Sequence, residues 1–147
     1  MSIGALNAMV VLLAANGFFV AAEFAFTAAS RHRLEAMPGR SARAAVRAID
    51  ELSFTLAGAQ LGITIASLLL GAVAEPAVAS GIESTVGAII EIPEPTLHTI
   101  ALIVALLIVV FLHMVIGEMG PKNVAIADPE RSSLLMALPF RAYATVF

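Results

Sequence analysis

Residues 97–117 read LHTIALIVALLIVVFLHMVIG, a stretch that contains no Asp, Glu, Lys or Arg. About 20 apolar residues in a helix are enough to cross the roughly 30 Å hydrocarbon core of a bilayer. Two further stretches have the same character: residues 3–29, interrupted by Asn7, Asn16 and Glu23, and residues 54–78. A segment surrounded by lipid must satisfy its own backbone hydrogen bonds, which a helix does. We therefore predict an all-α integral membrane fold with three transmembrane helices.

The composition supports a membrane domain. Of the 147 residues, 60% are hydrophobic and 13% are charged, whereas soluble domains are about 45–50% apolar and about 25% charged. A soluble domain of this size leaves too much surface exposed to hide so many apolar side chains. We expect one domain over residues 1–147, with the lipid bilayer as its partner and no role for nucleic acid.

The basic residues predict the orientation of the chain. All eight lie between the first two stretches or after the third, at Arg31, Arg33, Arg40, Arg43, Arg47, Lys122, Arg131 and Arg141. The connection between the second and third stretches carries only acidic charges. Because Lys and Arg accumulate on the cytoplasmic side, we expect the N-terminus outside and the C-terminus in the cytoplasm. The predicted location is the cell inner (plasma) membrane, as a multi-pass protein.

Two segments are predicted to lie along the inner membrane surface. Residues 40–51 place Arg40, Arg43 and Arg47 on one helical face with alanines opposite, which is typical of an interfacial helix. A solvated connector is the alternative. Residues 129–147 are expected to form a second interfacial helix that begins at Pro129 with Asp128 as its N-cap.

The third apolar stretch is followed by Gly117-Glu118-Met119-Gly120-Pro121. Pro121 has no backbone N–H and the two glycines permit non-helical conformations, so we expect the helix to break here. The end of a helix carries unpaired carbonyls with negative partial charge. A carboxylate at that end is unfavourable unless a cation binds, which makes Glu118 the leading candidate for a cation ligand. The alternative is an ion pair between Glu118 and Lys122.

Polar residues form a stripe on each of the first two predicted spans. The first stripe contains Asn16, Glu23, Thr27 and Ser30, and the second contains Gln60, Thr64, Ser67, Gly71 and Glu75. Such stripes can be packing seams or can line a cation path. Carboxylates favour the second interpretation, because a charged group in lipid costs about 2.5–3.5 kcal/mol and packing does not need one.

The candidate ligands are all oxygen donors. They are the Glu118 carboxylate, the Gly117 carbonyl and the Ser67 and Thr64 hydroxyls, with Glu23 as a second acidic position. Oxygen-only sites suit hard cations such as Mg²⁺, Ca²⁺ or Na⁺. There are no cysteines, so thiolate sites are excluded. His113 could be a ligand or proton carrier, or could simply bond a neighbouring helix.

Three blocks carry a family resemblance. NGFFVAAEFA at residues 16–25, QLGITIASLLLG at residues 60–71, and GEMGPKN at residues 117–123, followed by DPER, resemble the transmembrane domain of the CNNM/CorC magnesium transporters. Bacterial members of this family are often labelled hemolysin-related. The chain departs from the pattern at Ala21 or Ala22, where many relatives have serine, and at Thr64 or Ser67, where they have asparagine.

The resemblance implies a homodimer with three spans per subunit and a cytoplasmic belt of helices. It also implies Mg²⁺ export coupled to Na⁺ entry, with a largely dehydrated Mg²⁺ held by Glu118, the Gly117 carbonyl and polar side chains of the first two helices. The cytoplasmic CBS domains that usually follow are not within these residues.

We therefore predict a Mg²⁺ transporter domain that alternates access around this site. The alternative is a membrane-anchored sensor that binds Mg²⁺ without moving it. An intramembrane enzyme is not expected, because we find no nucleophile–base pair and no His within helical reach of Ser67.

Overall fold

The computed structural model describes residues 2–146, and within these residues every regular element is helical. The elements are α1 (Ile3–Ala28), α2 (Arg31–Glu35), α3 (Arg40–Asp50), α4 (Leu52–Val86), α5 (Glu94–Leu112), the π-helical segment η1 (His113–Met119), α6 (Gly120–Ala127) and α7 (Pro129–Ala144). Helices long and apolar enough to cross a membrane cover Ile3–Ala28, Leu52–Val86 and Glu94–Ala127. The predicted all-α membrane fold is confirmed.

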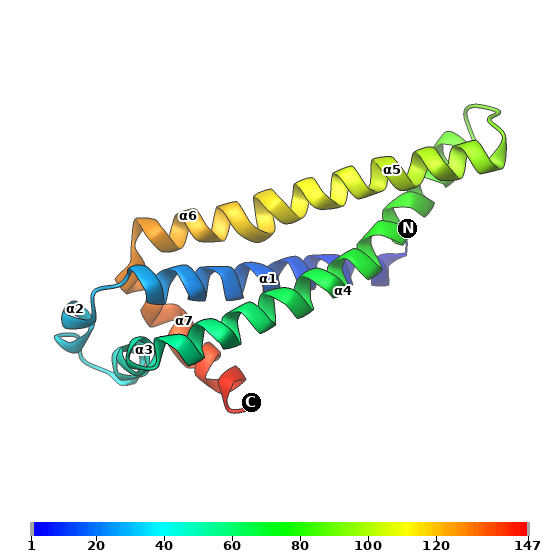
Figure 1. The fold of residues 1–147 in the computed structure, drawn as a ribbon. Helices are drawn as coiled ribbons and strands as arrows, with labels where there is room; N and C mark the ends of the chain where they lie inside the picture. Colours follow the sequence, from blue (N-terminus) through cyan, green and yellow to red (C-terminus); the bar gives the residue numbers. More distant parts are fainter. Residues whose placement is uncertain (1, 147) are drawn as a thin grey trace.

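The three long helices form an open bundle (Figure 1). α4 and α5 pack together near the hairpin that joins them, and α1 packs against α4, η1 and α6. Toward the other end, α4 and α6 separate, and α2, α3 and α7 gather there (Figure 1). The bundle therefore has a hairpin end that carries acidic residues and an opposite end where the Arg-rich segments lie.

Helix α4 is longer than the predicted span of residues 54–78. It has 35 residues, which corresponds to about 52 Å at 1.5 Å per residue, against a hydrocarbon core of about 30 Å. Pro76 lies inside this helix and cannot donate to the carbonyl four residues earlier. The helix nevertheless continues to Val86, because a single missing bond is tolerated in membrane helices.

The predicted break after residue 116 does not occur. α5 continues without interruption through η1 into α6, with the backbone N–H of Gly120 bonded to the Val115 carbonyl five residues earlier. Pro121 lies at the start of α6, and the Gly117 carbonyl that its missing N–H leaves free accepts a hydrogen bond from Asn16 instead. The prediction of a broken helix was therefore wrong: Gly117 and Pro121 change the helical hydrogen-bond pattern without ending the helix.

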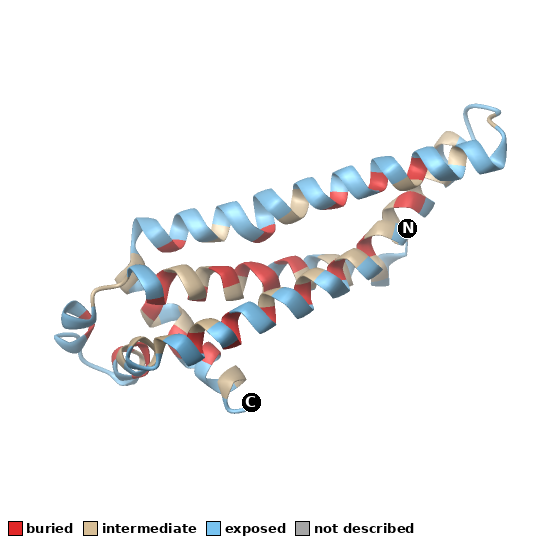
Figure 2. Cartoon of the chain, viewed as in Figure 1, coloured by how far each residue is buried: buried red, intermediate tan, exposed pale blue. Residues whose placement is uncertain are grey.

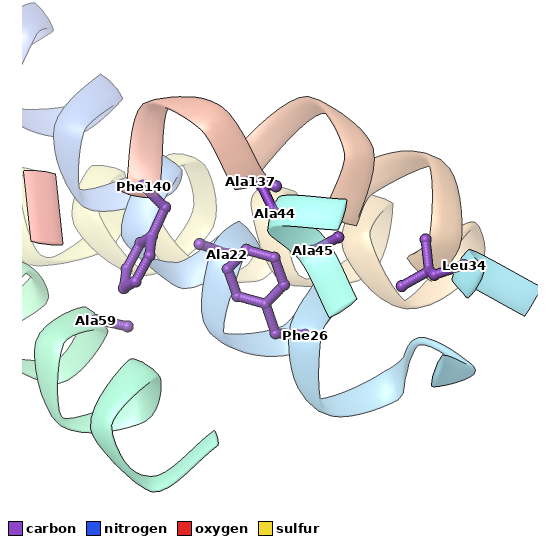
Figure 3. Packing of buried hydrophobic residues seen from close by; sticks show 8 residues of the cluster. All are labelled: Ala22, Phe26, Leu34, Ala44, Ala45, Ala59, Ala137 and Phe140. Atoms are coloured by element: carbon purple, nitrogen blue, oxygen red, sulfur yellow. The ribbon is translucent and has the colours of Figure 1, made fainter. Parts of the chain in front are cut away.

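Small residues let the helices approach one another at the end opposite the hairpin (Figure 3). Four elements contribute alanines around the contact of Phe26 with Phe140, whose ring centres are 5.6 Å apart. These fully or nearly fully buried alanines are Ala22, Ala44, Ala45, Ala59 and Ala137. Elsewhere, the buried positions lie mainly on the facing sides of α1 and α4, while α5 is largely exposed (Figure 2).

The two segments predicted to be interfacial, residues 40–51 and 129–147, are helical over Arg40–Asp50 and Pro129–Ala144, and residue 147 lies outside the described residues. In α3 three alanines, Ala42, Ala44 and Ala45, are buried and the arginines are exposed. Gly39 precedes this helix with a φ of 112°, which favours glycine. Asp128 caps α7 by accepting a hydrogen bond from the Arg131 N–H at 3.2 Å, as predicted. Their position at the membrane surface remains a prediction.

An ion-pair group fastens α2 to the end of α3. Arg31 contacts Glu35 and donates to the Asp50 carboxylate at 2.6 Å. The hydrogen bond with Arg31 lowers the pKa of Asp50, and the same bond raises the pKa of Arg31. Both groups therefore remain charged over the whole physiological pH range.

Candidate functional site

Asn16 joins three helices inside the bundle. Its side chain is completely buried. The Nδ2 group donates to the Gly117 carbonyl at 2.9 Å, and Oδ1 accepts from the Ser67 hydroxyl at 3.1 Å. A buried amide is costly unless it is hydrogen-bonded, so these two bonds fix α4 and η1 against α1 at this level of the bundle.

The Gly117 carbonyl is available to Asn16 because of Pro121. In an α-helix this carbonyl would accept from the N–H four residues later, but residue 121 is proline and has no N–H. Glycine is also required by the close packing. A Cβ at position 117 would lie 2.9 Å from His113 Cδ2 and 3.1 Å from Asn16 Nδ2. The spacing of Gly117 and Pro121 thus presents a backbone oxygen to the neighbouring helix.

The π-helical segment brings His113 and Glu118 together. Residues five apart in an α-helix point about 140° away from each other, whereas a π-helix bonds residues i and i+5 and stacks them. The Glu118 Oε1 atom lies 3.6 Å from His113 Nε2. The alternative pair with Lys122 does not form, because Lys122 Nζ lies over the Phe24 ring at 4.5 Å from its centre.

Ser67 and His113 contact each other, which the sequence did not reveal. Ser67 Oγ is 3.2 Å from His113 Nε2; no histidine lies within helical reach of Ser67 on α4, but His113 of η1 is in contact with it. Sequence spacing relates residues within one helix, whereas Ser67 and His113 belong to two different helices. Because the Ser67 hydroxyl donates its single proton to Asn16, Nε2 must donate to Ser67. This direction is opposite to the activation of a serine nucleophile by a histidine base.

The five predicted site residues do not all meet. Ser67, Gly117 and Glu118 lie in one cluster with Asn16 and His113. Thr64 is exposed on α4, and its hydroxyl donates to the Gln60 carbonyl at 2.8 Å.

Glu23 lies seven residues after Asn16 on the same face of α1, which is about 10 Å along the axis. It is partly buried and has no ion-pair partner among residues 2–146.

Two members of the cluster, Asn16 and His113, were not among the five predicted site residues, although the sequence offered His113 as a possible ligand or as a partner of a neighbouring helix. Asn16 belonged to the same polar stripe as Glu23, seven residues away, and that stripe was the available signal. His113 could not be placed, because its position depends on the π-helical geometry. We refer to Asn16, Ser67, His113, Gly117 and Glu118 together as the polar cluster.

The donors of the polar cluster are chemically suited to a hard cation. They comprise a backbone carbonyl, an amide oxygen, a hydroxyl, one carboxylate and one imidazole. Within residues 2–146, no group of three or more His, Cys, Asp or Glu side chains is arranged to hold a metal. An ion at this place would therefore rely mainly on neutral oxygen donors, as Mg²⁺ and Ca²⁺ sites often do.

Three apolar helices and a polar cluster between them define a multi-pass α-helical membrane domain. The chain belongs to the CNNM family: the family model described as "Cyclin M transmembrane N-terminal domain" matches residues 8–147. The resemblance seen in the three sequence blocks is thereby confirmed.

The chain is similar to several longer proteins. It is 46% identical over 136 residues to "Uncharacterized protein Rv1841c" of Mycobacterium tuberculosis, covering 90% of this chain and 38% of that protein. It is 37% identical over 139 residues to "UPF0053 protein YhdT" of Bacillus subtilis, covering 90% and 29%. For "UPF0053 protein YugS" of Bacillus subtilis the identity is 39% over 137 residues, covering 91% and 32%. The chain thus spans about a third of the length of these relatives.

Proposed function

We propose that this chain is the membrane domain of a divalent cation transporter and that Mg²⁺ is its cargo. The family is associated with divalent cation transport. The observation that carries the proposal is the polar cluster, in which a buried amide, a hydroxyl, a freed carbonyl and a carboxylate converge from three helices of an apolar bundle. Groups that are costly to place in lipid are expected to serve a substrate or ion pathway.

The donors fit Mg²⁺ in kind. Mg²⁺ prefers six oxygens at about 2.0–2.1 Å and usually keeps several waters. The Gly117 carbonyl and the Asn16 amide oxygen each have a second lone pair beside the one already used. The Ser67 hydroxyl adds a third neutral oxygen, and Glu118 supplies negative charge. Water would complete the shell.

Glu23 and Thr64 are outside the polar cluster, and we propose separate roles for them. Glu23 lies toward the predicted cytoplasmic end of α1 and would hold the cation on its way to the polar cluster. Thr64 is exposed near Ser67 on α4 and would reach the ion only after movement of α4 or beside a second subunit. We propose a homodimer, because that arrangement would shelter the exposed Thr64 and Gln60 from lipid.

The relatives are longer than this chain, which supports the presence of further domains in the family. We propose that cytoplasmic domains, including CBS domains, follow this membrane domain. The N-terminus would lie outside and the C-terminus in the cytoplasm of a plasma membrane. The proposed activity is Mg²⁺ export driven by Na⁺ entry.

The test is Mg²⁺ flux into and out of liposomes that contain the purified protein, with and without a Na⁺ gradient. Flux that follows the Na⁺ gradient supports coupled transport. Mg²⁺ binding without any flux would contradict transport and favour the sensor.

The site itself is tested by Glu118→Gln. At about 100 times its dissociation constant, Mg²⁺ should stabilise the unmodified protein by about 2.7 kcal/mol. Glu118→Gln should abolish this stabilisation, because it removes the charge of the polar cluster. Glu91→Gln, which changes an exposed glutamate outside the helices, is the matched control and should keep it. Equal stabilisation of both variants would contradict the assigned site.

A further inference from the structure

We propose that His113 is a direct ligand of the transported cation through Nε2 and that it shifts the selectivity of the site toward Mn²⁺ over Mg²⁺. This inference rests on the proposed function, because it names a further ligand for the same ion. The predicted ligand set contained only oxygen donors. The folded chain adds one imidazole nitrogen to that set.

The distances place His113 Nε2 among the proposed ligands. It is 3.2 Å from Ser67 Oγ and 3.6 Å from Glu118 Oε1. Two ligands in neighbouring positions of an octahedron, each about 2.1 Å from the ion, are about 3.0 Å apart. The Ser67 separation exceeds this value by about 0.2 Å and the Glu118 separation by about 0.6 Å. Small side-chain adjustments would therefore bring all three atoms around one ion.

The π-helical segment is the reason for this juxtaposition. It stacks His113 and Glu118 on one face, which an α-helix would turn apart. The His113 ring is largely buried, with 23% of its side chain exposed, whereas the Glu118 side chain is 49% exposed. The nitrogen thus faces the interior of the polar cluster, beside the α4 hydroxyl.

Imidazole changes which cation the site prefers. Mg²⁺ binds oxygen ligands almost exclusively, whereas imidazole suits divalent transition metals. Mn²⁺ accepts both carboxylate oxygen and imidazole nitrogen, so a mixed set favours it. Binding requires the neutral ring with its proton on Nδ1, so the proton moves from Nε2, where it now bonds Ser67, to Nδ1. No net charge change is needed.

Electron spin echo envelope modulation of bound Mn²⁺ tests the ligand directly, because a coordinated imidazole nitrogen gives a characteristic ¹⁴N signal. We expect this signal in the unmodified protein in detergent. It should disappear in His113→Gln, which offers an oxygen instead, and persist in His98→Gln, which changes a histidine at the hairpin end. Mn²⁺ bound to the unmodified protein without nitrogen coupling would overturn the proposal, whether or not His113→Gln folds.

Selectivity gives a second readout. The Mn²⁺ concentration needed for half-maximal thermal stabilisation should be lower than the Mg²⁺ concentration that has the same effect, because Mg²⁺ binds oxygen ligands almost exclusively. The ratio of the two half-maximal concentrations, Mg²⁺ over Mn²⁺, should approach one in His113→Gln. An unchanged ratio in a folded His113→Gln protein would contradict the proposal. Nitrogen coupling in a protein that shows no ion flux would support His113 as a ligand and would count against transport. Ion flux that is lost in Glu118→Gln, in a protein whose bound Mn²⁺ shows no nitrogen coupling, would support transport and would count against His113 as a ligand.

Discussion

Asn16 shows how much of the arrangement depends on one side chain. It uses both ends of its amide, one for a backbone carbonyl of η1 and the other for a hydroxyl of α4. An asparagine has the shape to do this, since its donor and acceptor lie side by side on one planar group. No aliphatic residue of similar size could connect the same two helices.

We predict that Asn16→Ala lowers the thermal stability of the domain in detergent by about 1–2 kcal/mol, because it removes two interhelical hydrogen bonds and leaves the Gly117 carbonyl unpaired. Asn7→Ala, on the exposed start of the same helix, is the control and should have little effect. Equal melting temperatures for the two variants would show that the Asn16 contacts do not hold the helices together.

Gly62 is a second residue whose identity the packing demands. A Cβ at this position would lie 2.6 Å from three atoms of the Phe19 ring. That ring cannot easily retreat, because it packs against Phe18 and Tyr143, with ring centres 5.1 Å and 4.6 Å away.

Gly62→Ala should therefore destabilise the domain by about 1–3 kcal/mol, which is typical of overpacking. Gly71 is on the same helix and has open space around its Cβ position, so Gly71→Ala should be close to neutral. Thermal unfolding of both variants in one detergent measures the difference. A Gly62→Ala protein as stable as Gly71→Ala would mean that α1 and α4 are not packed as described.

The π-helical segment is the element that sequence reasoning described incorrectly. Two glycines and a proline within five residues are typical of a helix end, and the pattern gives no sign that the chain will continue in a helix beyond them. The continuation depends on Asn16 from another helix, which satisfies the carbonyl that Pro121 leaves free. Such a partner is 101 positions away in the sequence and is invisible to local patterns.

We predict that Pro121→Ala converts part of η1 to α-helix. The new N–H at position 121 can bond the Gly117 carbonyl and compete with Asn16. His113 and Glu118 would then turn away from each other, and the response to divalent cations should fall.

Two cysteines introduced at positions 113 and 118 report this change, because their cross-linking yield should drop when Pro121→Ala is added. Pro139→Ala, in α7 outside the spans, is the control and should leave the yield unchanged. A yield unaffected by Pro121→Ala would contradict the role of Pro121 in the π-helical geometry.

At the scale of the whole molecule, the sequence predicted the all-helical fold and the three helices that are long and apolar enough to cross a membrane, but not α2 or the continuation of the third helix into α6. Long apolar stretches have few alternatives in lipid, and caps such as Asp128 act locally. The site was predicted only in part. Ser67, Gly117 and Glu118 are connected through Asn16 and His113. Whether Thr64 faces them depends on the rotation of α4, which is set by contacts such as the Tyr143 hydroxyl donating to the Gly58 carbonyl at 3.0 Å.

The orientation of the domain in the membrane can be tested in a background without cysteines. We predict that Glu91→Cys reacts with a membrane-impermeant thiol reagent added outside intact cells, and that Arg43→Cys reacts only after the membrane is opened. Both positions are exposed in the folded chain, so folding does not limit the reaction. The opposite pattern would reverse the predicted topology.

The length of α4 has a mechanical consequence. Ser67 lies near the midpoint of a continuous helix that contacts α5 near one end and α3 near the other. A stiff rod that tilts about its middle moves its two ends in opposite directions while the pivot hardly shifts. A displacement of the end of α4 beside α3 would accordingly move the hairpin end of α4 in the opposite direction, as in a lever.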